Sequence, residues 1–515
     1  MRHSKKNLAL ITKQAHILVS YPMGMINKTR IALGSVLLVT AFVASCSLPK
    51  RIIYAPSPDK ARISKLSKRI DEILQDTLLL GATTGIKVIS LRANKVLYKH
   101  NADKLFNPAS NMKLITSAAA LVKLGPEYKF KTVVYADTNI KNSKVLGNIY
   151  IKGYGDPDLK TVDLLEMAKD IKWKGTKEIT GDLIVDDFFF DSIRKGRGWM
   201  WDYGPYVYNA RIGALSLNEN SIMISVKPGD KAGAPVKVRL EPPTKYVDID
   251  NQGIAEKGWF RSNLDIDRVM CDDRDVVVIA GTLSINSTGI TVFRNLENPP
   301  IYTATVFKEL LEKEGIKIDG DIKIDTVPID VVEELVTHYS EPLTKIIYYM
   351  NKVSSNFVAE QLLKTLGTVF EGEPGTADKG MSVVTDFMSQ IGVHPGKYRA
   401  TDGSGLSRYD LLSPSQIIKL LIFMYDDFEY GPEYLTSLPV AGIDGTLRRR
   451  MREPSIQRKM RAKTGTLSGV SCLSGYVPIR DGDILVFAMM MNNFLGNVNN
   501  IRRLQDRIGE ALVDF

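Results

Sequence analysis

The pattern of short strands in the middle of the chain constrains the fold more than any other feature. Between residues 131 and 335, segments such as TVVYAD, GNIYIKG and RDVVVIAGTL alternate with turns. Helical periodicity appears on both sides, over residues 60–80 and again from about residue 340. Since 515 residues are too many for one ordinary core, we predict an α/β (α+β) domain formed by residues 60–130 and 336–515. A β-rich insertion of one or two lobes, residues 131–335, splits that domain.

The charge distribution and the cysteine and histidine contents exclude several classes of function. The net charge of +10 falls to +4 without residues 1–45, which carry six basic residues and no acidic one. A nearly balanced remainder gives little attraction for nucleic acid. Three scattered cysteines and five histidines form no disulfide framework and no metal-ligand spacing. We therefore expect no nucleic-acid partner, no metal and no organic cofactor.

The first 45 residues have the layout of an export signal. An apolar run, residues 31–45, follows basic residues and ends in small residues, and it is too short to span a bilayer comfortably. The string Val43-Ala44-Ser45-Cys46 resembles the lipobox of bacterial lipoproteins. We therefore expect lipidation at Cys46, with the protein held on a membrane in an extracytoplasmic compartment, the periplasm. The alternatives are an ordinary signal peptide and an uncleaved anchor helix.

The string NPASNMKLIT places Ser110 at a helix start, with Lys113 one turn further on. Residues three apart share a helix face, so the two side chains can hydrogen-bond. A serine hydroxyl needs a base before it acts as a nucleophile, and a lysine supplies one where burial lowers its pKa. The pattern alone also fits a helix-capping serine followed by a solvated lysine.

Two later segments supply what a Ser-Lys pair lacks. Ser354 and Asn356 lie at a helix junction, where a hydroxyl can relay a proton and an amide can hold the lysine. Lys463-Thr464-Gly465 lies on a late strand and offers a positive charge, a hydroxyl and a close backbone approach. The backbone N–H of Thr466 can join that of Ser110 in an oxyanion hole. Taken singly, these segments also fit an exposed loop and an ordinary strand end.

The three segments occur together in the order found in β-lactamases and penicillin-binding proteins, with Ser355 where the common pattern has Asp. The resemblance extends over residues 60–515. The strings NPASNMKLIT, ALSLNEN, MNKVSSNFVAEQLL, DGSGLSR, LPVAGIDGTL and RAKTGTLSG resemble the class C low-molecular-mass penicillin-binding proteins, a D-alanyl-D-alanine carboxypeptidase/endopeptidase family. The resemblance implies a penicillin-binding-protein/β-lactamase-like transpeptidase domain with a large insertion.

The same resemblance assigns the residue roles. It implies that Ser110 is acylated, Lys113 is the general base, Ser354 shuttles protons beside Asn356, and Lys463 sets the electrostatics. The substrates would be peptidoglycan stem peptides ending in D-Ala-D-Ala, and β-lactams would acylate the same serine. The remaining candidates for substrate binding are Thr464, Gly465, Thr466 and Arg408. Two rival functions are a β-lactamase or esterase on this fold and a non-catalytic peptidoglycan-binding lipoprotein.

Other residues have a structural explanation that is equally good. Arg408 fits a substrate contact or a surface arginine. Asp202, Tyr206 and Tyr208, in the aromatic stretch GWMWDYGPYVYNA, fit a side-chain pocket or lobe packing. The loop Asp402–Gly405 is expected near the cleft. The basic run from residue 448 to residue 463 fits a solvated surface or an attraction for carboxylate-bearing peptidoglycan.

Overall fold

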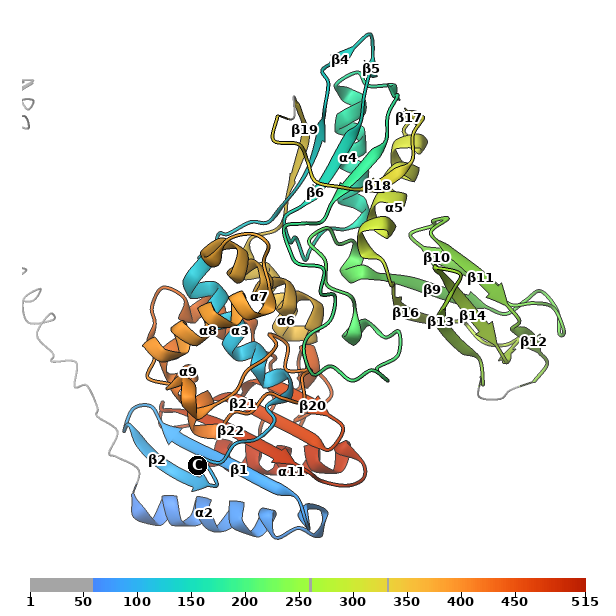
Figure 1. Ribbon diagram of the computed structural model, residues 1–515. Helices are drawn as coiled ribbons and strands as arrows, with labels where there is room; N and C mark the ends of the chain where they lie inside the picture. Colours follow the sequence, from blue (N-terminus) through green and yellow to red (C-terminus); the bar gives the residue numbers. More distant parts are fainter. Residues whose placement is uncertain (1–58, 259–261, 331–332) are drawn as a thin grey trace, which may run out of the picture. The chain divides into compact units, whose positions relative to one another are not determined.

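A computed structural model describes residues 59–258, 262–330 and 333–515 (Figure 1). The predicted export signal and Cys46 lie outside these residues. Among the described helices, none has the length and apolar character needed to cross a membrane. The mixture of helices with antiparallel and mixed sheets confirms the predicted α/β (α+β) class.

A five-stranded antiparallel sheet joins the beginning of the described chain to its end. Its strand order is β2-β1-β22-β21-β20, so the N-terminal hairpin pairs with the last strand through β1 and β22. The bounds are β1 Thr83–Ser90, β2 Lys95–His100, β20 Arg461–Leu467, β21 Val470–Pro478 and β22 Ile484–Asn492. Almost every residue of β21 and β22 is buried, which requires a cover on both faces of the sheet.

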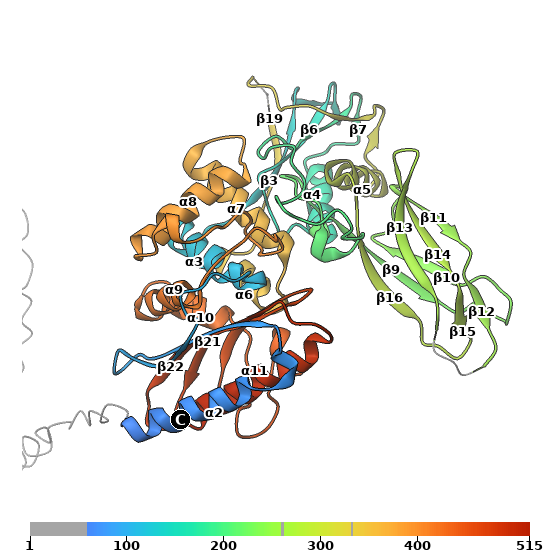
Figure 2. The ribbon, with the colours of Figure 1, turned by 60° about the horizontal axis from the view of Figure 1, so that its bottom comes forward.

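Helices cover both faces of this sheet, and β22 shows the division. Met489 and Met491 pack with α2 (Lys60–Leu74) and α11 (Val498–Val513) on one face. Ala488 and Met490 belong to the core on the other face, which contains α3 (Met112–Leu124) and α9 (Pro414–Asp426). Figure 2 shows α2 and α11 together beneath the sheet. Side chains alternate along a strand, so β22 contributes to two cores.

The helical layer surrounds α3, in which every residue from Met112 to Leu121 is buried. Ala and small hydroxyl residues fill much of this helix, so its neighbours can approach closely. Those neighbours are α6 Leu343–Val353, α7 Asn356–Glu371, α8 Ala377–Gln390, α9 and α10 Gly431–Ser437. Ser110 lies just ahead of α3, in a short 3-10 turn, Ala109–Asn111. A largely buried helix therefore carries the predicted nucleophile just ahead of its N-terminal end.

The first lobe of the insertion is a sheet with two helices packed against it. The sheet order is β18-β8-β6-β3-β19, and a small sheet, β17-β7-β5-β4, adjoins it. The strands are β3 Lys131–Ala136, β4 Ile140–Lys141, β5 Lys144–Val145, β6 Ile149–Gly153, β7 Glu178–Ile179, β8 Leu183–Asp186, β17 Lys317–Ile318, β18 Ile322–Ile324 and β19 Glu333–Tyr339. The helices are α4 Thr161–Trp173 and α5 Pro299–Lys313, which the strand pattern did not reveal.

The second lobe, residues 221–296, is built from strands alone. Its sheets have the orders β10-β9-β16, β11-β14-β13 and β12-β15. The bounds are β9 Ser221–Lys227, β10 Lys237–Glu241, β11 Val247–Asn251, β12 Ile254–Glu256, β13 Asp265–Cys271, β14 Arg274–Ala280, β15 Thr282–Ser284 and β16 Ile290–Asn295. Ile224 of β9 and Val277 of β14 belong to one core, so the two larger sheets pack face to face.

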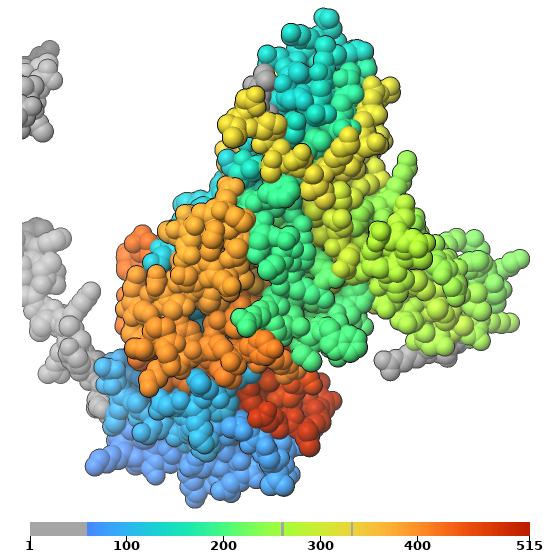
Figure 3. All heavy atoms as spheres, in the orientation of Figure 1, coloured from blue at the N-terminus to red at the C-terminus, as the bar shows by residue number. Residues whose placement is uncertain are grey.

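The insertion leaves the helical layer intact because its first and last strands are neighbours. The chain enters the insertion along β3, directly after α3, and returns along β19, directly before α6. These two strands pair antiparallel, and α3 and α6 remain in contact. The space-filling view in Figure 3 shows insertion residues, in green, against the orange helices. An ion pair from Lys364 Nζ to Asp191 Oδ1, 2.5 Å long, joins the two there.

Candidate active site

The predicted catalytic side chains converge on one place although they come from three distant segments. Lys113 Nζ lies 3.1 Å from Ser110 Oγ and 2.5 Å from Asn356 Oδ1. Lys463 Nζ lies 2.8 Å from Ser354 Oγ. The lysines are fully buried, so water does not screen these contacts as it would at the surface. The structure therefore brings together all five residues for which the sequence predicted a chemical role.

The backbone around Ser110 is shaped by close contacts that require glycine. A Cβ at Gly465 would lie 2.7 Å from Pro108 O and 3.1 Å from Ser110 N, so strand β20 can touch the nucleophile's turn only with glycine there. Gly405 has a φ of +78°, and a Cβ at that position would overlap Ala109 O. The motif glycine and the loop glycine thus set the position of Ser110 from two sides.

Burial controls the charge of the two lysines. Burial lowers the pKa of Lys113 to about 7, while Asp402, Glu360 and Asp410 partly oppose this shift. Burial also lowers the pKa of Lys463 well below its usual value, and the charge of Lys113 lowers it further. Two ammonium groups in one buried site repel each other, which favours the loss of a proton from one of them. One of the two lysines is therefore available as a base.

A buried acidic cluster holds the loop that carries Ser404, whose carbonyl accepts from Lys113 Nζ at 2.7 Å. Glu360 Oε1 accepts the backbone N–H groups of Gly403 and Ser404 at 3.0 and 2.8 Å. Asp402 accepts from the backbone of Gly405 at 2.7 Å. Burial and the charge of Asp402 raise the pKa of Glu360 to about 8. The Asp402–Gly405 loop is near the cleft, as predicted, and its Ser404 carbonyl holds the amine of Lys113 in place.

Ser110 opens onto two cavities, one on each side. The first, of about 490 Å³, is lined by Ser110, Tyr203, Tyr208, Ser354, Asn356, Gly405, Leu406, Arg408, Thr466, Leu467 and Ser468. The second, of about 340 Å³, is lined by Ser110, Ser354, Thr446, Arg450, Thr464, Thr466 and Arg502. Arg408 and Tyr208 thus line this cavity, which is one of the two positions that the sequence left open for each of them. Tyr206 stacks on Tyr208 without lining the cavity, Asp202 does not line it, and Tyr203 was missed.

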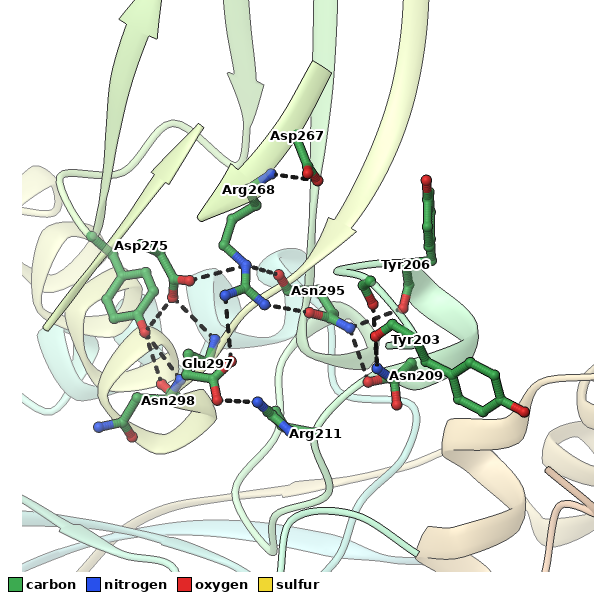
Figure 4. Close-up of polar contacts among 12 residues, drawn as sticks. Tyr203, Tyr206, Asn209, Arg211, Asp267, Arg268, Asp275, Asn295, Glu297 and Asn298 are labelled. Atoms are coloured by element: carbon green, nitrogen blue, oxygen red, sulfur yellow. Dashed lines mark hydrogen bonds and ion pairs between the residues drawn. The ribbon is translucent and has the colours of Figure 1, made fainter. Parts of the chain in front are cut away.

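The tyrosine loop, residues 199–209, is held by a polar network from the second lobe of the insertion (Figure 4). Asn295 Nδ2 donates to the carbonyls of Tyr206 and Asn209, both at 2.9 Å. Arg268, nearly buried, donates to Asn295 Oδ1 at 2.7 Å and to Asn295 O at 3.0 Å. Arg268 also forms an ion pair with Asp275, whose Oδ1 lies 3.2 Å from Arg268 Nε. The second lobe therefore supports one wall of the first cavity.

Glu219 is a second contact between insertion and cleft that the sequence did not reveal. Ser355 Oγ donates to Glu219 Oε2 at 2.6 Å, and the hydroxyl of Tyr349 donates to the other carboxylate oxygen. Asn218, Glu219 and Asn220 all have left-handed φ values, from 50° to 53°, which cost energy in non-glycine residues and need support from their surroundings. The string ALSLNEN contributed to the family resemblance, but no role followed for its glutamate.

The chemistry of the site is that of serine acyl transfer. Hydroxyl, amine, amide and backbone N–H groups surround Ser110, and these suit a covalent ester intermediate. Within the described part of the chain, no three His, Cys, Asp or Glu side chains gather as metal ligands would. The arrangement thus differs from a histidine triad and uses lysine where a triad uses imidazole.

Comparisons with known proteins agree with this geometry. Residues 66–511 match the D-Ala-D-Ala carboxypeptidase 3 (S13) family. The chain is 34% identical to a D-alanyl-D-alanine carboxypeptidase of Actinomadura sp. (strain R39), over 88% of this chain and 86% of that protein. It is 26% identical to D-alanyl-D-alanine carboxypeptidase DacB of Haemophilus influenzae, over 90% and 92% of the two chains.

Solved structures share the fold. Penicillin-binding protein 4 (dacB) from Haemophilus influenzae superposes with a TM-score of 0.76 at 24% identity and covers 86% of this chain and 98% of its own. The same protein complexed with a novel β-lactam gives a TM-score of 0.71 at 23% identity, with 88% and 98% covered. At these identities the likeness is one of fold.

Proposed function

Because the chain belongs to the D-Ala-D-Ala carboxypeptidase 3 (S13) family, we propose that Ser110 is the acylated nucleophile of a serine D-Ala-D-Ala carboxypeptidase acting on peptidoglycan peptides. The observation that carries this assignment is the placement of Ser110 Oγ 3.1 Å from the buried amine of Lys113, at the point where two cavities meet. Endopeptidase action on D-alanyl cross-links would use the same groups with a different departing amine. β-Lactams would form an ester with the same serine.

In the first step Lys113 takes the proton of Ser110 as the hydroxyl oxygen attacks the carbonyl of the penultimate D-alanine. The backbone N–H groups of Ser110 and Thr466 would stabilise the negative oxygen that forms. The C–N bond then breaks, and the proton passes from Lys113 through Ser354 to the departing nitrogen. Water hydrolyses the ester in the second step, with Lys113 again the base. Free D-alanine and a shortened peptide are the products.

The substrate itself helps to decide which lysine stays neutral. The carboxylate of the terminal residue is negative, so its arrival near Lys463 would raise the pKa of that group. The proton that the two lysines share would then rest on Lys463, which leaves Lys113 free to act as base. The hydrogen bond from Lys463 to Ser354 supports this division, because a charged Lys463 can assist proton transfer through that hydroxyl.

The first cavity would hold the part of the peptide that remains on the enzyme. Tyr203 and Tyr208 line it from the insertion, and Arg408 lines it from the helical domain. Arg408 donates to Ser468 O at 2.9 Å, and its remaining N–H groups would serve an acceptor on the peptide. Thr464 lines the second cavity and would face the departing residue, whereas Gly465 lies against the turn of Ser110.

Labelling with a fluorescent penicillin tests the nucleophile. We expect the protein to be labelled covalently and Ser110→Ala to lose the label. Ser117→Ala, on the same helix, should keep it, because that hydroxyl bonds only to helix carbonyls. Persistent labelling of Ser110→Ala would refute the assignment. Slow release of the label, together with D-alanine release from an acetylated L-Lys-D-Ala-D-Ala peptide, would separate a peptidase from a β-lactamase.

We also propose that Cys46 carries lipid and holds the enzyme on a membrane in the periplasm. The support is the sequence Val43-Ala44-Ser45-Cys46 after the apolar run, together with a cell-wall substrate that lies outside the cytoplasm. An inhibitor of lipoprotein signal peptidase should make the precursor accumulate. An unchanged mass would remove the lipid from this account.

A further inference from the structure

The second cavity beside Ser110 has an unusual lining. Three threonine hydroxyls face it, from Thr446, Thr464 and Thr466, together with the guanidinium groups of Arg450 and Arg502. The Thr446 and Thr464 hydroxyls bond to each other at 2.7 Å. The cavity therefore combines hydroxyl donors with two positive charges and no carboxylate. This lining suits an anion.

The two arginines differ in how their charges are compensated. Arg450 donates to Asp506 Oδ1 through Nη2 at 2.6 Å and through Nε at 3.0 Å, so its charge is neutralised within the protein. Arg502 donates only to neutral oxygens, Asn499 Oδ1 and Thr466 Oγ1, both at 3.0 Å. Of the carboxylates in the described residues, none lies within 4.0 Å of its guanidinium nitrogens. Arg502 is thus the cation of this cavity that has no anionic partner.

The surroundings of Arg502 favour an incoming negative charge. Its side chain is partly buried, and burial together with the charge of Arg450 lowers the pKa of Arg502, while the charge of Asp506, which pairs with Arg450, partly opposes this shift. A partly desolvated cation beside another cation is stabilised most by an anion that joins them. The hydrogen bond from Arg502 to Thr466 also fixes the position of the guanidinium N–H groups at the mouth of the cavity, next to strand β20.

We propose that Arg502 is a specificity-determining residue that binds the free α-carboxylate of the departing residue, with the Thr466 hydroxyl beside it. This inference rests on the proposed function and names the side chain that recognises the free carboxylate of the substrate. The planar guanidinium presents two parallel N–H donors to a carboxylate, which a lysine cannot do. Recognition of the carboxylate, and not of the side chain, would admit a terminal D-alanine and also a cross-linked residue whose α-carboxylate is free.

Arg502→Gln and its matched control Arg503→Gln test the proposal. Gln keeps an N–H group that can donate to Thr466 but removes the charge. Arg503, the next residue, is exposed and bonds to Asn500 on the same helix. We would measure kcat/KM for an acetylated L-Lys-D-Ala-D-Ala peptide and for the same peptide with a C-terminal amide.

For Arg502→Gln we expect kcat/KM on the free acid to fall by about 10- to 100-fold, the usual effect of losing a hydrogen bond to a charged group. For the peptide with the C-terminal amide, kcat/KM for cleavage of the D-Ala-D-Ala bond should stay unchanged. Arg503→Gln should match the wild type on both peptides. Arg502→Lys should recover part of the lost kcat/KM on the free acid, because lysine restores the charge without the two parallel N–H donors of the guanidinium. An equal fall on both peptides would show that Arg502 only holds Thr466, and no fall on either would also overturn the proposal.

Penicillin labelling of the same variants keeps this outcome separate from the proposed function. If wild type and Arg502→Gln are both labelled while the preference for the free acid is unchanged, the role of Arg502 is refuted and the nucleophile assignment stands. If the wild type releases neither D-alanine from the free acid nor D-alaninamide from the amide, the proposed function itself fails.

Discussion

Lys463 Nζ lies 2.8 Å from Ser354 Oγ, although 109 positions separate the two residues in the chain. Ser354 has a left-handed backbone, with φ 65° and ψ 42°, and ends α6, whereas Ser355 begins α7 as its N-cap. The sharp turn between the helices sends neighbouring hydroxyls in different directions. Ser354 points to Lys463 and the cleft, and Ser355 points to Glu219 and the insertion.

Substitution of the two serines should therefore have different effects. Ser354→Ala removes the proposed proton shuttle, and we expect acylation by a penicillin to slow by about 100-fold or more with little change in Tm. Ser355→Ala removes a helix cap, which should cost about 1 kcal/mol of stability, seen as a lower Tm, and it removes a donor to Glu219, so acylation should slow less than in Ser354→Ala. Stopped-flow acylation and thermal unfolding of both variants would check this. Equal slowing by both would show that the motif acts as one structural unit.

Glu219 is expected to matter for catalysis although it touches no substrate. Its carboxylate oxygens accept from the hydroxyls of Ser355 and Tyr349. Glu219→Gln would replace one of these oxygens with an NH2 group, which faces a hydroxyl that also donates, so one hydrogen bond would be lost. We expect acylation to slow by about 5- to 50-fold for peptide and penicillin alike, the effect of one charged hydrogen bond. Glu341→Gln is the control, because Glu341 is exposed and pairs only with Lys345. A change confined to Tm would reduce Glu219 to a structural role.

The acylation rate should depend on pH near neutrality. Burial lowers the pKa of Lys113 to about 7, and only the neutral amine can accept the proton of Ser110. Below this pKa the lysine is protonated, so the rate constant should fall as pH decreases and level off above it. Acylation by penicillin across this range, with Tm measured at each pH to exclude unfolding, would provide the check. A rate that does not change through neutrality would argue against Lys113 as the base.

The support from the second lobe should affect peptides more than small inhibitors. Asn295→Ala removes the donors to the carbonyls of Tyr206 and Asn209 (Figure 4), so the tyrosine loop should lose its fixed position. We expect KM for a stem peptide to rise by about 10-fold, the effect of one or two lost hydrogen bonds. Acylation by a small β-lactam should hardly change. Asn286→Ala, an exposed asparagine in the same lobe, is the control, and parallel losses on both ligands would contradict the idea.

The sequence could identify the side chains that converge on Ser110 because their signals are local. Ser110 and Lys113 are one turn apart. Lys463 comes from the short KTG motif on a strand, and Ser354 and Asn356 come from one turn between helices. Ser110 lies near a helix N-terminus, as predicted: it belongs to a 3-10 turn, and α3 itself begins two residues later at Met112. The helices α4 and α5 were missed because each is flanked by short strands, and the strand pattern of residues 131–335 dominated the interpretation.

The supporting residues could not be predicted because their effect comes from tertiary contacts. Glu219 meets Ser355 across 136 positions, and Arg502 meets Thr466 across 36. Each is a single polar residue in a segment whose local pattern indicates only a turn or an amphipathic helix. The left-handed backbone of residues 218–220 gives no local signal either, because asparagine and glutamate also occur in ordinary turns.

The pairing of β1 with β22 has a consequence for the order in which the enzyme becomes competent. Ser110 and Lys113 leave the ribosome early, but β20, β21 and β22, which complete the sheet and bring Lys463 to the nucleophile, are synthesised almost last. A growing chain therefore cannot assemble the site around Ser110 until nearly all of the chain has been made.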